Sequence, residues 1–136
     1  MKKILFLFIT ALIVVSCDDT SKDIQLKTLN FTVNNTSWIE NTDSAGLNRY
    51  YSCHIAIPEI TSTVFSGGTV TSYIAFTNPN SLETLPYVRH YQNAAGALWT
   101  QTIDFDYSVG GVNIYVTNSD FVVDPPSTMS FRFVII

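Results

Sequence analysis

Two pairs of residues have the types and spacing from which a metal site or an acid–base site could be built. Asp104 and Asp106 are two residues apart, so in a β-strand their side chains lie on the same face. Such carboxylates could contribute to a Ca²⁺ site, which needs about six to eight oxygen ligands. His54 and His90 are distant in sequence and fall at positions expected to face solvent. We favour an ordinary solvated strand face, and we predict no metal site and no cofactor.

Side chains for covalent or acid–base catalysis do not form a recognisable set. Ser66-Gly67-Gly68 lacks the Gly-x-Ser-x-Gly spacing of a nucleophile elbow. Cys53 falls on the core side of its strand and is expected to pack as a small apolar residue. Glu40, Glu59 and Glu83 show no pairing of the kind that hydrolysis by two carboxylates requires. We therefore predict no catalytic residues and no enzymatic activity.

A third group of residues could bind a ligand without transforming it. Several aromatic residues fall on the polar side of their strands, beside Asn and Thr, where they would form a surface for stacking on sugars or for contact with a protein. The candidates for this surface are Trp38, Tyr50, Tyr73 and Tyr87. The alternative is that aromatic residues occur on both faces simply because β-sheets favour them.

The elements that must position these residues are mostly strands. Apolar and polar residues alternate, as in half-buried strands, over residues 29–33, 51–57, 70–76, 98–109, 112–116 and 129–136. Pro86 marks an edge or a bend, and Gly110-Gly111 is predicted as a two-residue hairpin turn that follows Val109 on the core side. Turns about every 8 to 12 residues are typical of a sandwich or small barrel. We predict an all-β fold, a single antiparallel β-sandwich of about seven or eight strands.

One short helix is predicted near residues 59–66. Pro58 suits a first helical position, and Ile60 and Val64 are four residues apart on one face. Gly67-Gly68 could supply a left-handed residue that ends the helix. The β-branched residues Thr61, Thr63 and Val64 weaken this helical tendency.

The beginning of the chain has the pattern of an export signal. Two lysines precede an apolar run from Ile4 to Val15, which is shorter than the roughly 20 residues of a permanent transmembrane helix and typical of a signal helix. Val14-Val15-Ser16-Cys17 resembles the lipobox of bacterial lipoproteins. The resemblance implies a diacylglycerol thioether on Cys17, cleavage before it by signal peptidase II, and acylation of the new amine. The alternative is an ordinary secretory peptide that is cut near Ser16.

This interpretation divides the chain into a signal peptide (1–16), the lipidated Cys17 with a flexible tether (17–25), and a β-sandwich domain (26–136). Without residues 1–16, five basic and eleven acidic residues remain, which gives a net charge of −6. Such a charge argues against a nucleic-acid partner, which needs a basic face. Cys53 is then the one unmodified thiol of the sequence, so a disulfide within the domain is not expected.

Several short segments carry a family resemblance: Tyr50-Tyr51, Ile57 to Thr61, Gly68 to Val70, Leu85 to Tyr87 and Phe131 to Ile136. Together they resemble small lipoproteins of Bacteroidota and the C-terminal domains of collagen-like bacterial proteins. The resemblance implies a β domain and an envelope location, and no catalytic residue.

Two further matches concern location and modification. Acidic residues follow Cys17 and resemble the surface-export signals of Bacteroidota lipoproteins, although a solvated spacer has the same composition. Asp43-Ser44-Ala45 resembles the O-glycosylation sequon of the same phylum, which makes Ser44 a candidate for modification.

The sequence thus predicts an exported protein that is attached to the outer membrane through lipid on Cys17, with its domain facing either the cell surface or the periplasm. We expect a binding or structural module with a glycan or a protein as partner. The alternative is a small hydrolase or an accessory subunit of an envelope enzyme complex.

Overall fold

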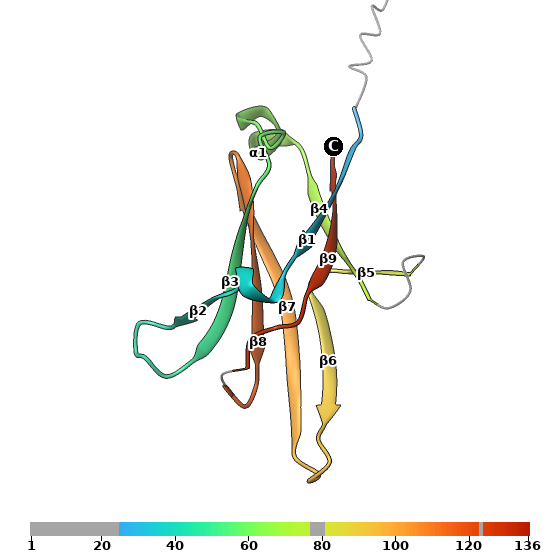
Figure 1. Cartoon of the computed structure of the whole chain (residues 1–136). Coiled ribbons are helices and arrows are strands. Elements are labelled where there is room, and N and C mark those ends of the chain that lie inside the picture. The colour runs from blue at the N-terminus through green and yellow to red at the C-terminus, as the bar shows by residue number, and fades with distance from the viewer. Residues whose placement is uncertain (1–24, 77–80, 123) are drawn as a thin grey trace, which may run out of the picture.

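Antiparallel strands dominate the computed structural model, which describes residues 25–76, 81–122 and 124–136 (Figure 1). The predicted signal peptide (1–16), Cys17 and nearly all of the tether lie outside the described residues. The strands are β1 (Lys27–Val33), β2 (Ile39–Thr42), β3 (Arg49–Ala56), β4 (Val70–Ala75), β5 (Leu82–Thr84), β6 (Tyr87–Gln92), β7 (Leu98–Ser108), β8 (Gly111–Asn118) and β9 (Met129–Ile135).

The strands form two sheets, with the orders β1-β9-β4-β5 and β2-β3-β8-β7-β6. Between them lies one core, whose fully buried members include Ile74 and Phe133 from one sheet and Ile103 and Ile114 from the other. The predicted all-β sandwich is confirmed. The strand number exceeds the prediction partly because two strands, β5 and β6, flank Pro86, where the sequence predicts an edge or a bend. The chain passes from β5 in the smaller sheet to β6 in the larger one at the buried Leu85 and at Pro86.

The predicted helix exists but lies slightly further along the chain, at α1 (Ser62–Gly67). Its first residue follows Thr61, whose hydroxyl oxygen accepts a hydrogen bond from the Val64 N–H at 3.3 Å, which is an N-cap interaction. Pro58 precedes the helix because Ile60 must first enter the core, where it is completely buried. The proposed left-handed ending is wrong, since Gly68 has a φ of −98°.

The hairpin between β7 and β8 turns one residue earlier than predicted. Ser108 pairs with Gly111, so the two turn residues are Val109 and Gly110. Gly110 has a φ of 89°, a left-handed conformation that glycine adopts without strain. Val109 was expected on the core side, but its side chain is 56% exposed, because the turn interrupts the alternation of the strand.

The two sheets differ in length, and this difference creates the open region described below. β7 has eleven residues whereas β9 has seven. Figure 1 shows β6 and β7 continuing beyond the other sheet at the end of the sandwich opposite α1. The start of β1 and the C-terminus lie at the α1 end, where Lys27 pairs with Ile135. No helix in the described parts of the chain has the length and apolar character to cross a membrane.

Candidate functional site

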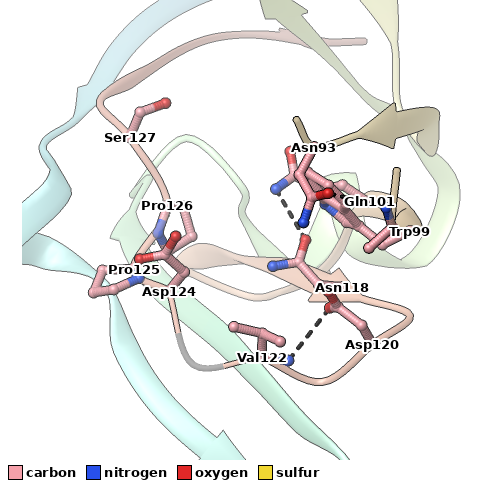
Figure 2. A pocket seen from close by; sticks show the side chains of 11 residues that line it. Asn93, Trp99, Gln101, Asn118, Asp120, Val122, Asp124, Pro125, Pro126 and Ser127 are labelled. Carbon is pink, nitrogen blue, oxygen red and sulfur yellow. Dashed lines mark hydrogen bonds between the residues drawn. The ribbon is translucent and has the colours of Figure 1, made fainter. Parts of the chain in front are cut away.

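A cleft of about 410 Å³ lies at the end of the sandwich where the larger sheet is uncovered (Figure 2). Its volume falls within the roughly 300–1,000 Å³ typical of small-ligand sites. One wall is the inner face of β7 and β8, and the other is the connection from β8 to β9. The lining side chains that can interact specifically with a ligand are Asn93, Trp99, Gln101, Asn118, Asp120 and Asp124.

Trp99 is held in place by a row of stacked side chains on the inner face of β6 and β7. Tyr91 lies directly opposite Trp99 in the register, and the two rings stack with centroids 5.4 Å apart and an interplanar angle of 14°. The guanidinium carbon of Arg89 is 5.7 Å from the Tyr91 centroid and 6.0 Å from that of Phe76. Such contacts stabilise aromatic side chains in a fixed orientation, so the cleft has a preformed aromatic wall.

Two amides of the cleft are joined across the sheet. Gln101 Nε2 donates to Asn118 Oδ1 at 3.1 Å. Each amide carries both an acceptor and donors, so Gln101 keeps its acceptor and Asn118 its donors for a ligand. Asn93 uses its Oδ1 to accept from the Ala95 and Ala97 N–H groups at 3.0 and 2.9 Å, which shapes the loop between β6 and β7.

The opposite wall carries two exposed carboxylates. Asp120 accepts the Val122 N–H at 3.3 Å, and Asp124 lies further along the same connection (Figure 2). Among the described residues that line this cleft, none is a lysine or an arginine. The charges that a ligand would meet directly in the described part of the cleft are therefore negative.

A strained residue lies at the rim of the cleft, between the lining residues Asp120 and Val122. Phe121 has a φ of 53°, which is unusual for a bulky residue. Its N–H donates to Asn118 O at 3.0 Å, which closes a turn in which glycine would be free of strain. Its side chain is nevertheless 38% exposed. An outlier of this kind motivates a functional hypothesis.

The four aromatic residues predicted as a binding surface do not lie together. Trp38 is buried, with 8% of its surface exposed, and its Nε1–H donates to Ser127 O at 3.3 Å. Its predicted exposure is wrong, because the 3₁₀ turn at Asn35–Ser37 turns the side chain inward. Tyr73 lies on the outer face of the smaller sheet and Tyr50 on that of the larger one, since their strand neighbours are buried.

Tyr87 lies on the inner face of β6. It is paired in register with the fully buried Ile103, and its ring centroid is 4.9 Å from that of Phe76. Tyr87 therefore contributes to the packing beside the cleft, and the arrangement does not support a joint surface with Tyr50 or Tyr73.

Asp106 and His54 are brought into one hydrogen-bonded chain on the outer face of the larger sheet. His54 Nδ1 is 2.9 Å from Asn113 Oδ1, and Asn113 Nδ2 donates to Asp106 Oδ1 at 2.8 Å. The Tyr115 hydroxyl donates to Asp106 Oδ2 at 2.7 Å. This bond to a carboxylate is the main cause that raises the pKa of Tyr115 to about 12.

The other two residues considered for metal binding add little to this chain. Asp104 shares the face of Asp106, as predicted, and its pKa is raised by partial burial and then by the charge of Asp106. His90 is separate, with its Nδ1 2.9 Å from Thr100 Oγ1. Within residues 25–76, 81–122 and 124–136, no three His, Cys, Asp or Glu side chains gather in a way that could hold a metal ion.

The remaining candidates lie where the sequence suggested. Cys53 is buried, and desolvation raises the pKa of its thiol, so it is poorly placed to react. Ser44 is exposed in the hairpin between β2 and β3. Asp43 organises that hairpin by accepting the Leu47 N–H at 2.9 Å, and this bond is the largest cause that lowers the pKa of Asp43.

The sequence-based candidates do not include the cleft, because Trp99 falls on the apolar side of the alternating segment 98–109 and that side is expected to form the core. A signal was available in Gln101, a polar residue at an inward-facing position between Trp99 and Ile103. An inward-facing amide beside an indole indicates that this stretch of the face is not covered by apolar side chains.

The fold and the cleft have to be interpreted on their own geometry. No protein-family model matches the chain, and no curated protein and no solved structure is significantly similar to it.

Proposed function

We propose that this chain is a lipoprotein of the cell envelope that acts as a binding module, with lipid on Cys17 as its anchor and the cleft at the end of the sandwich as its site. The anchor is suggested by the lipobox-like Val14-Val15-Ser16-Cys17. The acidic residues after Cys17, which resemble a surface-export signal, support an outer-membrane location with the domain facing outward.

The observation that carries this proposal is the position of the cleft. The chain enters the sandwich at Lys27, which pairs with Ile135, whereas Trp99 and Gln101 of the cleft lie near the beginning of β7. Figure 1 shows the start of β1 at the α1 end of the sandwich and the connection between β6 and β7 at the opposite end. β7 has eleven residues, so at about 3.3 Å per residue the two ends of this strand are roughly 30 Å apart. A domain tethered by residues before Lys27 would present this site away from the membrane, as a binding lipoprotein requires.

A small hydrolase is the second candidate, and the chain from His54 to Tyr115 is the observation that favours it. We prefer a binding role for two reasons. Asp106 already accepts hydrogen bonds from Asn113 and Tyr115 on its two oxygens, so both oxygens are engaged by neighbouring side chains of the sheet. His54 contacts the amide oxygen of Asn113, but among the described residues no hydroxyl or thiol nucleophile is hydrogen-bonded to its ring, as the base of a catalytic triad requires.

The anchor is tested by fractionation of cells that express the wild type, Cys17→Ala or Cys53→Ala. We expect labelled palmitate and membrane association in the wild type and in Cys53→Ala, since Cys53 is buried, and neither in Cys17→Ala. Protease treatment of intact cells then locates the domain. Membrane association of Cys17→Ala equal to that of the wild type would contradict the anchor.

The binding role is tested with the mature chain (residues 17–136) carrying Cys17→Ser, titrated against a panel of envelope glycans, host glycans and peptides. We expect binding that Trp99→Ala weakens and that Tyr50→Ala leaves unchanged, because Tyr50 is an aromatic residue on the outer face of the sheet. An enhanced rate of substrate cleavage that depends on His54 and Asp106 would support the second candidate instead.

A further inference from the structure

We infer that the cleft is part of a longer groove that binds a linear, neutral oligosaccharide along its length. This inference rests on the proposed binding function and specifies its ligand. It follows from the continuity of two hollows, from the chemistry of their lining, and from the strained aromatic residue at the rim.

The groove consists of two hollows that adjoin across Gln101 and Ser127, which line both. The first is the cleft of Figure 2, with Trp99 in its wall. The second has a volume of about 370 Å³, and Tyr91 and Phe76 line it. Because Tyr91 and Trp99 stack on each other, the aromatic pair lies where the hollows meet. An elongated ligand could contact both aromatic residues, whereas a single compact ligand would fill only one hollow.

The lining suits the surface of a sugar. A sugar ring has an apolar C–H face, which can pack on an aromatic ring, and hydroxyl groups that both donate and accept hydrogen bonds. Gln101 and Asn118 offer an acceptor and donors in fixed positions because they are bonded to each other. Asp120 and Asp124 add carboxylate acceptors for hydroxyl donors, and their exposure to solvent makes them secondary to the aromatic pair and the paired amides.

The charge of the lining argues for a neutral ligand over an anionic one. Asp120 and Asp124 are the charged residues among those that line the two hollows in the described part of the chain, and both are negative. Arg89 lies beside the second hollow, but its guanidinium is over the rings of Tyr91 and Phe76. Uronic, sulfated or phosphorylated sugars would therefore meet repulsion in the first hollow.

A basic peptide is the competing ligand, and the exposure of the carboxylates makes it the weaker choice. Asp120 and Asp124 are both exposed to solvent, where an ion pair is worth only about 0–1 kcal/mol. The aromatic pair and the paired amides are held in place by contact with each other, and these groups do not require a charged partner.

The backbone strain at Phe121 is a separate indication that the rim of the cleft contacts a ligand. Its left-handed φ of 53° would be relieved by glycine, and its ring is part of the exposed apolar surface together with Val122. An exposed aromatic ring kept at the expense of backbone strain is expected where it touches a ligand. Phe121 lies in the chain between the lining residues Asp120 and Val122, so a ligand that extends past the rim could reach its ring.

The experiment is calorimetric titration of the mature chain (residues 17–136, Cys17→Ser) with three probes. These are neutral linear oligosaccharides from one to six sugar residues, oligogalacturonate, and a lysine-rich peptide. For neutral linkages that bind, we expect affinity to rise with chain length until both hollows are occupied, and no measurable binding of oligogalacturonate. Trp99→Ala and Gln101→Ala should each weaken binding about tenfold, while Tyr50→Ala should leave it unchanged.

Three outcomes would overturn the inference and also distinguish it from the proposed function. Binding of the peptide but of no oligosaccharide, with loss in Trp99→Ala, would exclude a glycan ligand but keep the cleft as a binding site. Neutral sugars that bind without dependence on length would exclude the continuous groove. Binding that is equal in Trp99→Ala and the wild type would remove both the inference and the site, provided that thermal unfolding shows each variant to be folded.

Discussion

Replacement of Gly68 by alanine should disrupt the contact between the end of α1 and the end of β9. A Cβ atom at this position would lie 2.4 Å from Ile136 O and 2.9 Å from Val64 O. Both neighbours are backbone atoms, so they cannot move aside as a flexible side chain could. The φ of Gly68 is −98°, a value that any residue can adopt. Glycine is therefore required here by the close approach of backbone atoms and not by its backbone conformation.

The size of the effect follows from the bonds that would be displaced. Thr69 and Ile136 exchange two backbone hydrogen bonds of 3.0 Å each, worth about 0.5–1.5 kcal/mol apiece. Their loss, or equivalent overpacking, should lower the free energy of unfolding by about 1–3 kcal/mol. For a domain of this size, the midpoint of thermal unfolding should fall by roughly 4 °C for each kcal/mol.

Gly67→Ala is the matched control, because a Cβ at Gly67 would meet no atom within 4 Å. It should leave the stability unchanged or raise it by about 0.4–1 kcal/mol through a less flexible unfolded chain. Both variants can be compared with the mature wild type by urea unfolding, followed by the fluorescence of the buried Trp38. A Gly68→Ala variant as stable as Gly67→Ala would refute the reasoning.

Three further predictions follow from local geometry. Phe121→Gly should be more stable than Phe121→Ala by about 1 kcal/mol, the reverse of the usual order, and both should bind the proposed ligand less well; urea unfolding that shows alanine as the more stable variant would contradict the strain. The pKa of Tyr115, raised to about 12 in the folded state against about 10 in the unfolded state, should contribute stability that is complete below about pH 10 and is lost as the pH rises to about 12. Tyr115→Phe should therefore show a shallower decline over that window, and an identical decline would argue against the bond to Asp106. Finally, Ser44 is exposed in its hairpin, so the native protein should carry a glycan mass that Ser44→Ala lacks; an unmodified mass of the native protein would exclude this modification.

The sandwich could be predicted because alternation along a strand directly reflects which side chains face the core. Ile74, Ile103 and Phe133 lie on predicted core sides and are completely buried. The pattern fails at Trp38 and Val109, where a 3₁₀ turn and a hairpin turn change the direction of the side chains. The alternation of side chains is a property of regular strands, so it no longer predicts which side chains are buried within one or two residues of a turn.

The cleft could not be predicted in the same way. Alternation shows that Trp99 and Gln101 face inward, but it does not show how far the opposite sheet extends over them. That depends on the register between strands distant in sequence, such as the pairing of β9 with β1 and β4. The connection from β8 to β9, with Asp120 and Asp124, forms the other wall. Its position near Gln101 also depends on contacts between segments that are distant in sequence.

The antiparallel pairing of β1 with β9 has a mechanical consequence for an anchored domain. If a ligand held in the groove is pulled away from the membrane, the tension enters the fold at Lys27 and acts along the axis of β1. The seven residue pairs from Lys27↔Ile135 to Val33↔Met129 are then loaded together in shear, rather than opened one after another as in a zipper. Such a geometry resists force better than peeling does, which would suit a domain that holds its ligand at the surface of a cell in flow.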